Sequence, residues 1–233
     1  MTAPQYERIK AALRLRIQRG DLCPGDRVPS ENQLVVDFGV SRMTARRALL
    51  ELAEDGLLAR TQGLGTFVAD NRPVSSVTQI RNIAEEIGQR GHRHSCQVLV
   101  LESREADPAL ALQLGVAAGE RIFHSVLVHR EDGVPVQWES RQVVARLAPG
   151  YLEQDFTRVT PSAFLSAVAP LTEADQTVEA VLPTAAIAAE LEMDLEQPCL
   201  KIIRRTFSHR GVVSLAELIH PGDRYRLGSH IDS

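Results

Sequence analysis

Two hydrophobic patterns divide the chain into an N-terminal and a C-terminal part. Apolar residues recur at helical spacing through the first fifty or so positions, and two short strand-like segments follow. From about residue 95 onward, most segments are rich in Val, Ile, Leu and Thr, as in strands. The stretch 69–76 is polar and contains a proline. The pattern therefore predicts two domains, residues 1–68 and 77–233, joined by a linker at 69–76.

Capping residues define two adjacent helices in the N-terminal part. Ser30 is a favourable N-cap with Gln33 in the capping-box position, so we expect a helix from about residue 31 to 38 that Gly39 ends. Ser41 then caps a second helix. Its inward positions are Ala45, Ala48, Leu49 and Leu52, which leaves Arg42, Thr44, Arg46 and Arg47 toward solvent. A helix of this kind after a tight turn is suited to the DNA major groove, where arginine reads guanine and hydroxyls bind phosphate.

Two short strands, 57–61 and 66–68, flank the turn Gln62-Gly63-Leu64-Gly65. Two glycines in one turn let the backbone approach a phosphate or the minor groove closely. The alternative is a hairpin that only covers the end of the small core. Together with the capped helices, the hairpin predicts a winged helix-turn-helix that binds double-stranded DNA.

The second part predicts an α+β domain with a mainly antiparallel sheet. Asp132-Gly133 and Arg210-Gly211 lie between strand pairs as hairpin turns. One helix is expected over 77–90, and two short ones begin near Asp107 and Pro183. The expected strands cover 95–103, 121–130, 134–144, 171–182, 199–208, 212–220 and 225–228.

Charge and composition limit the possible functions. The chain has 233 residues and a net charge of −4, but residues 1–72 carry 11 Lys or Arg against 9 Asp or Glu, a net charge of +2 that leaves −6 for the rest. A local arginine cluster therefore has to bind DNA, and two linked copies on half-sites about one helical turn apart, or a multiple of it, would raise a modest affinity. With no apolar stretch of about 20 residues and no signal peptide, we expect a cytoplasmic protein without a membrane partner. Cys23, Cys96 and Cys199 lack the spacing of a zinc site and are expected to be reduced.

The segments 24–31, 40–49 and the turn at Gly63 to Gly65 resemble the GntR family of transcription regulators. The resemblance implies that Ser41, Arg42, Thr44 and Arg46 meet bases and phosphates, and that Gln62, Gly63 and Thr66 touch the minor groove. Ser30, Arg47 and Gly65 complete the predicted DNA-binding set.

The second part resembles the UTRA effector-binding domain of the HutC branch of that family, which shares its fold with chorismate lyase. Segments 132–141, 151–157, 160–161, 170–173, 198–206 and 220–227 carry the resemblance. It implies a homodimeric repressor of histidine-degradation genes that urocanate releases from its operator, with no other cofactor. The positions that correspond to effector contacts are Ser95, His129, Glu139, Ser162, Glu217 and Tyr225, with Arg141 on the same face as Glu139. Where sugar-phosphate binders of this class carry arginine, this chain has Leu127 and His129, which argues against a phosphorylated ligand.

Several alternatives remain open from the residues alone. Glu139 and Arg141 could form a surface ladder pair, and Tyr225 could be a core aromatic. A plain Asp132-Gly133 turn would pair His129 with Val136 and put Glu139 on the other face, so a shared pocket requires a bulge or a longer loop. Histidine spacing does not predict a metal site, and no catalytic triad or phosphate loop is visible. A lyase-like enzyme and a ligand-blind dimeric DNA binder are the competing functions.

Overall fold

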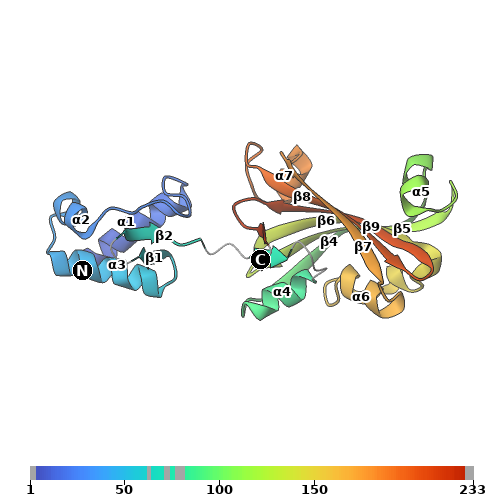
Figure 1. The fold of residues 1–233 in the computed structure, drawn as a ribbon, viewed down its shortest axis with the longest axis horizontal. Coiled ribbons are helices and arrows are strands. Elements are labelled where there is room, and N and C mark those ends of the chain that lie inside the picture. The colour runs from blue at the N-terminus through green and yellow to red at the C-terminus, as the bar shows by residue number, and fades with distance from the viewer. Residues whose placement is uncertain (1–3, 62–63, 71–73, 77–81, 229–233) are drawn as a thin grey trace, which may run out of the picture. The chain divides into compact units, whose positions relative to one another are not determined.

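The computed structural model describes residues 4–61, 64–70, 74–76 and 82–228. The chain forms two compact units, residues 1–71 and 72–233 (Figure 1). None of the described helices is long and apolar enough to cross a membrane.

The first unit packs three helices against a two-stranded hairpin. The helices are α1 (Gln5–Gln18), α2 (Glu31–Phe38) and α3 (Arg42–Glu54), and the antiparallel strands are β1 (Leu58–Thr61) and β2 (Gly65–Val68). Their common core includes Ile9, Leu13, Leu34, Leu49, Leu52 and Leu58, each at most 3% exposed. The predicted winged helix-turn-helix is therefore confirmed as a fold.

Local hydrogen bonds start α2 and α3, and Gly39 ends α2, where the sequence predicts. The Ser30 hydroxyl accepts from the Gln33 amide at 3.2 Å, and Gly39 ends the helix with a φ of 63°. The Ser41 hydroxyl accepts from the Thr44 amide at 3.1 Å. The reciprocal capping-box bond does not form, because the Gln33 side chain instead donates to Asp37 at 2.8 Å.

The second unit is built on a six-stranded antiparallel sheet with the order β4-β5-β6-β9-β8-β7. The strands are β4 (His94–Glu105), β5 (Arg121–Glu131), β6 (Val134–Val144), β7 (Glu173–Val181), β8 (Cys199–Ser208) and β9 (Gly211–Pro221). A separate parallel pair joins β3 (Val74–Ser76) to β10 (Arg226–Gly228). The predicted α+β class with a mainly antiparallel sheet is confirmed.

Helices cover both faces of this sheet (Figure 1). The helices α4 (Ile83–Gln89) and α6 (Pro161–Val168) lie on one side, and α5 (Pro108–Leu114) and α7 (Ala185–Glu190) lie on the other. Two 3₁₀ turns, η1 (Ala145–Leu147) and η2 (Tyr151–Glu153), follow β6. Tyr151 and Phe156, both fully buried, help to fill the largest core of this unit.

The structure departs from the sequence-based expectation at several boundaries. Residues 74–76, expected in the linker, form β3, and the helix expected over 77–90 is described only as α4, since residues 77–81 lie outside the described part. The second hairpin turns at His209 and Arg210, so that Gly211 already belongs to β9. Neither α6 nor the two 3₁₀ turns stood out in the hydrophobic pattern.

The hairpin between β5 and β6 contains the irregularity that a shared pocket requires. Asp132 and Gly133 both have positive φ, 49° and 87°, and form a two-residue turn. Arg130 pairs with Pro135, but His129 pairs with Gln137 rather than with Val136. Val136 is therefore the extra residue of a bulge in β6, and this bulge places Glu139 on the same face of the sheet as His129.

Candidate DNA-binding surface and effector pocket

The exposed side of α3 carries the cations that the sequence assigned to DNA. Ala45, Ala48, Leu49 and Leu52 are buried on the inner side of this helix. Arg42 opens the helix with a side chain 74% exposed. The hydroxyls of Ser41 and Thr44 are hydrogen-bonded to each other at 2.8 Å beside it. The N-terminal turn therefore presents hydroxyls and a guanidinium at one end of the helix.

A groove in the first unit joins this turn to the hairpin. Glu31 accepts from Arg42 Nε at 3.2 Å and lies 3.6 Å from Arg60 on β1. The groove is also lined by Arg27, Ser30, Asn32, Gly65 and Thr66. Three arginines around hydroxyl groups suit a phosphate backbone. Sequence reasoning missed Arg27 and Arg60, and strand alternation gave no signal for Arg60, because residue 60 shares a face of β1 with the buried Leu58.

Arg46 and Arg47 have different surroundings. Arg47 lies 3.8 Å from the centre of the Tyr6 ring, and its Nε donates to Glu51 at 2.8 Å. That hydrogen bond raises the pKa of Arg47. Arg46 is exposed and forms no ion pair with the part of the chain that the structure describes. Of the two, Arg46 is the better placed to reach a base.

The hairpin turn brings its backbone close to the groove. Gly65 has a φ of 125°, and a Cβ added there would lie 2.9 Å from Arg27 Nε. Only glycine fits this backbone comfortably. The other predicted wing residues, Gln62 and Gly63, lie outside the described residues.

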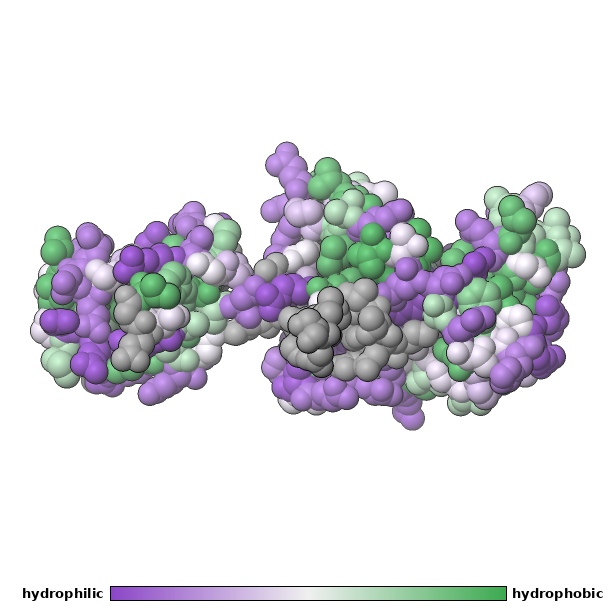
Figure 2. Space-filling view, viewed as in Figure 1, coloured by the Kyte–Doolittle hydropathy of each residue, from purple (hydrophilic) through white to green (hydrophobic). Residues whose placement is uncertain are grey.

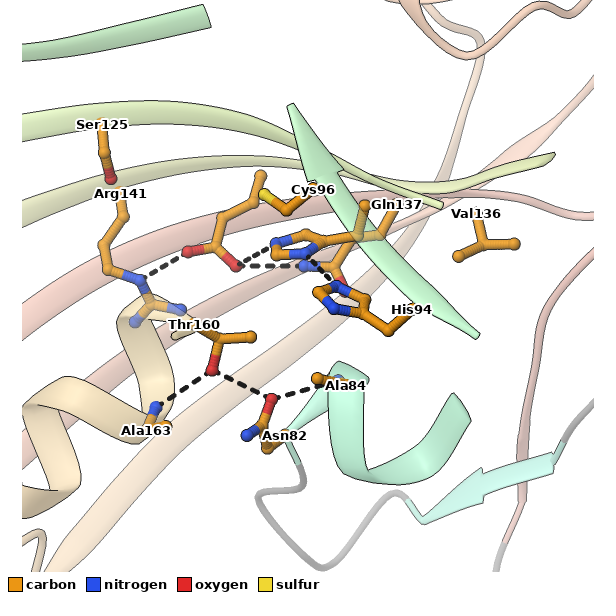
Figure 3. Close-up of polar contacts among 12 residues, drawn as sticks. Asn82, Ala84, His94, Cys96, Ser125, Val136, Gln137, Arg141, Thr160 and Ala163 are labelled. Atoms are coloured by element: carbon orange, nitrogen blue, oxygen red, sulfur yellow. Dashed lines mark hydrogen bonds and ion pairs between the residues drawn. The ribbon is translucent and has the colours of Figure 1, made fainter. Parts of the chain in front are cut away.

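In the second unit, a row of polar side chains crosses β4, β5 and β6 (Figure 3). His94 Nε2 lies 3.0 Å from His129 Nδ1, and His129 Nε2 lies 3.5 Å from a Glu139 oxygen. Arg141 Nε donates to the other Glu139 oxygen at 2.7 Å, and Arg141 Nη1 donates to Ser214 at 3.1 Å. Both Glu139 and Arg141 are 3% exposed. The alternative of a surface ladder pair is therefore wrong.

Burial and neighbouring charges shift the pKa values of the residues in this row. Burial alone would raise the pKa of Glu139, but the Arg141 guanidinium and His129 outweigh it and hold that pKa well below its usual range. Burial and the neighbouring His129 lower the pKa of His94 to about 4. Burial and the Glu139 charge raise the pKa of Cys96 to about 12. At neutral pH the row therefore holds an ionised carboxylate, a neutral His94 and a protonated thiol.

The row borders a pocket between the sheet and the helices α4 and α6. Thr160, the N-cap of α6, donates to the side-chain oxygen of Asn82 at 3.0 Å, and that oxygen caps α4 by accepting from Ala84 (Figure 3). The two helix starts are thus tied together at the pocket. Its lining comprises Asn82, Ile83, Glu86, Gln137, Glu139, Arg141, Thr160, Ser162, Ile202, Arg204, Leu218, His220 and Tyr225.

The pocket also contains a stacked ring pair and a second buried arginine. The rings of His220 and Tyr225 are 3.7 Å apart and tilted by only 13°. His220 Nδ1 lies 3.0 Å from the Val136 carbonyl oxygen, and burial lowers the pKa of His220 to about 3. Arg204 Nε donates to Gln176 at 2.9 Å, while burial and the nearby Arg141 lower the pKa of Arg204.

The structure brings together most of the predicted effector residues but not all. Glu139, Arg141, Ser162 and Tyr225 line the pocket, and His129 lies directly behind Glu139. Tyr225 also belongs to a small apolar cluster, so both interpretations of this residue hold in part.

Two of the predicted effector residues, Ser95 and Glu217, do not line this pocket, for the same geometric reason. Ser95 is exposed on β4, and its neighbour His94 has the side chain that turns toward His129. Glu217 pairs with Ser140, whereas the adjacent Leu218 lines the pocket. Successive residues of a strand point to opposite faces of the sheet, so an assignment that is displaced by one position selects a residue on the wrong face. Arg204 and His220, which sequence reasoning missed, carry no local signal beyond this alternation.

A capped helix-turn-helix with a glycine hairpin, followed by a sheet with a buried polar pocket, defines a DNA-binding regulator with a ligand-binding domain. Family models agree, because residues 5–68 match the bacterial regulatory proteins of the GntR family and residues 89–226 match the UTRA domain. The chain belongs to the GntR family, in its UTRA-containing branch. This is a family of transcription regulators, so the lyase-like enzyme is excluded as the function of the second domain.

Individual relatives narrow the comparison. The chain is 51% identical to the Histidine utilization repressor of Pseudomonas aeruginosa over 231 residues, which is 99% of this chain and 92% of that protein. The C-terminal domain of the histidine utilization repressor from Pseudomonas syringae is 50% identical, with a TM-score of 0.58 over 60% of this chain and 100% of that one. PhnF from Mycobacterium smegmatis is 26% identical, with a TM-score of 0.67 over 96% and 99% of the two chains.

Proposed function

We propose that this protein represses histidine-utilisation genes and leaves its operator when urocanate occupies the pocket of the second unit. The identity of about half the residues to a named histidine utilization repressor over nearly the whole chain carries the first part. The pocket chemistry supports the second part. No cofactor is required besides the effector.

Arg204 is the candidate partner for a ligand carboxylate. Glu139 and Arg141 neutralise each other through their 2.7 Å hydrogen bond. Arg204 is 8% exposed; burial and the nearby Arg141 lower its pKa, while Glu139 and the buried pocket residue Glu86 act to raise it. We infer that a ligand carboxylate pairs with the Arg204 guanidinium. A phosphate dianion would need further cations, and the strand position Leu127 supplies none.

The ring end of urocanate matches the stacked pair. His220 is neutral because its pKa is about 3, and its Nδ1 donates to the Val136 carbonyl. The other nitrogen, Nε2, is therefore an acceptor that an imidazole N–H could use. The flat faces of His220 and Tyr225 favour a planar ligand over a puckered sugar.

Repression in this proposal uses a homodimer in the cytoplasm. The first unit has too few cations for tight binding alone, so two copies on adjacent half-sites supply the affinity. Linkage then requires that operator DNA weaken urocanate binding by the factor with which urocanate weakens DNA binding, about 5 to 150-fold for a typical coupling.

The proposal is tested by measuring whether urocanate releases the full-length protein from its operator. A mobility-shift titration on the operator of the histidine-utilisation genes is run with urocanate, with N-acetylglucosamine 6-phosphate and with no ligand, and binding of each ligand is measured by calorimetry. We expect urocanate alone to bind and to release the DNA. Arg204→Gln should abolish the response to urocanate and leave ligand-free DNA affinity unchanged. The matched control is Arg205→Gln, since Arg205 lies next in sequence on the other face and pairs with Asp175 at 2.6 Å.

The outcomes separate the possibilities. Release by the sugar phosphate would overturn urocanate while leaving a ligand-controlled repressor. Binding of DNA that no ligand alters would favour a ligand-blind DNA binder. Equal loss of the response in both arginine variants would refute the assignment of Arg204 to the carboxylate.

A further inference from the structure

A large apolar side chain stands at the centre of the DNA-facing side of α3. Met43 is 72% exposed and lies between Arg42 and Thr44 in the first turn. Residue 43 precedes the fully buried Ala45 by two positions, which is about 200° around the helix. Met43 therefore points almost directly away from the core, farther from the hairpin side than Arg42.

The surroundings of Met43 give it no apolar partner large enough to bury it. The shallow depression it borders is otherwise lined by Tyr6, Thr44, Arg46, Arg47, Leu50, Glu51 and Glu54. Tyr6 is occupied by the Arg47 guanidinium. The visible face of the first unit likewise shows single apolar residues among hydrophilic ones (Figure 2). An unbranched thioether of this kind adapts readily to a surface that it meets on binding.

We propose that Met43 is a specificity-determining residue that recognises the C5-methyl group of a thymine in the operator half-site. This inference rests on the proposed DNA-binding function. If α3 enters the major groove by its first turn, Met43 has to face base edges. Most of those edges are hydrogen-bonding groups, and the thymine methyl is the bulkiest apolar group among them. An apolar side chain gains by contact with that methyl and loses by covering an unsatisfied donor or acceptor.

Removing the methyl group from the DNA tests the proposal. The full-length protein selects its operator from randomised DNA, and each thymine of the selected site is then replaced in turn by uracil, which pairs identically but lacks the methyl. At one thymine per half-site we expect the replacement to weaken binding about fourfold, the equivalent of one buried methyl group. Met43→Ala should bind the thymine and uracil sites equally at that position and should tolerate other bases there.

Val36→Ala is the matched control, because Val36 is 77% exposed on α2 and is equally apolar. It should keep the full sensitivity to uracil. Both changes are on the surface, so thermal unfolding should be unchanged. If Met43→Ala retains the uracil effect at every thymine, or if no uracil weakens the wild-type protein, the role of Met43 is refuted while DNA binding stands. If the full-length protein selects no DNA sequence at all, the proposed repressor function is refuted, and the role of Met43 is refuted with it.

Discussion

The buried pair of Glu139 and Arg141 allows a quantitative test of the second unit. Arg141→Met keeps the volume but leaves the Glu139 carboxylate in a site that is 3% exposed. Two unit charges about 4 Å apart attract by about 4 kcal/mol at an effective dielectric constant of 20. Breaking one side of a buried pair costs about 3–5 kcal/mol for the same reason. We expect a loss of unfolding free energy in this range at pH 7.5.

The only tryptophan, Trp138, makes the assay specific to this unit. It lies on β6 next to Glu139, so urea unfolding followed by its fluorescence reports the second unit and not the first. The double variant Glu139→Gln, Arg141→Met removes both charges. It should recover most of the stability, because a neutral amide no longer lacks a counter-charge.

Acidification supplies a second, independent check. In the wild type, the pKa of Glu139 is depressed, so its favourable contribution is present above the unfolded pKa and is lost only as the pH falls below it. In Arg141→Met, burial without the guanidinium raises the pKa of Glu139 above the unfolded value, and the folded variant gains stability relative to the wild type as the pH falls from 7.5 to 5. The difference between the two proteins should therefore shrink on acidification. A loss below about 1 kcal/mol at pH 7.5, or a difference that stays constant or grows toward pH 5, would refute this view of the pair.

Four further outcomes are expected. Arg46→Ala should weaken operator binding by about 1–3 kcal/mol in mobility-shift titrations and relax base discrimination, since this exposed arginine is a candidate guanine reader; an equal loss on random DNA would make it a phosphate contact. Arg47→Ala should cause a uniform loss and a shallower salt dependence, and a smaller loss than Arg46→Ala, because Arg47 is already held by Glu51 and Tyr6. Gly65→Val should lower DNA affinity but leave urocanate calorimetry unchanged, because a branched residue is strained at a φ of 125°; lost urocanate binding would contradict the independence of the units. Burial depresses the pKa of His94 to about 4, so the contribution of the neutral imidazole to stability is lost as the pH falls from about 6.5 toward 4. His94→Gln should therefore flatten the dependence of the unfolding free energy on pH in this range, as measured by Trp138 fluorescence. An unchanged slope would count against the burial of this imidazole.

Short-range rules were enough to predict the helix-turn-helix. Ser30, Gly39 and Ser41 act on amides within a few residues, so the caps of α2 and α3 follow from the local sequence. The Asp132-Gly133 hairpin is equally local, because both residues tolerate positive φ. The class of the protein could be read from these elements.

The orientation of strand residues could not be read with the same certainty. Strands have a period of two, so one displaced residue exchanges the two faces. The bulge after His129 places Glu139 and Arg141 beneath the sheet, as a shared pocket requires. The same rule leaves Ser95 and Glu217 outside the pocket, because a neighbour one position away has the inward side chain.

The pocket itself exists only in the tertiary structure. Arg204 and His220 join Glu139 because β9 lies between β6 and β8, a strand order that no local pattern encodes. Their chemical character also comes from burial, which lowers the pKa of both His220 and Arg204. Sequence alone determined the capped helix-turn-helix of a DNA-binding regulator, since capping and turn formation act over a few residues. The assembled sheet decided which polar groups face the pocket, since their proximity and desolvation arise only when distant strands pack together.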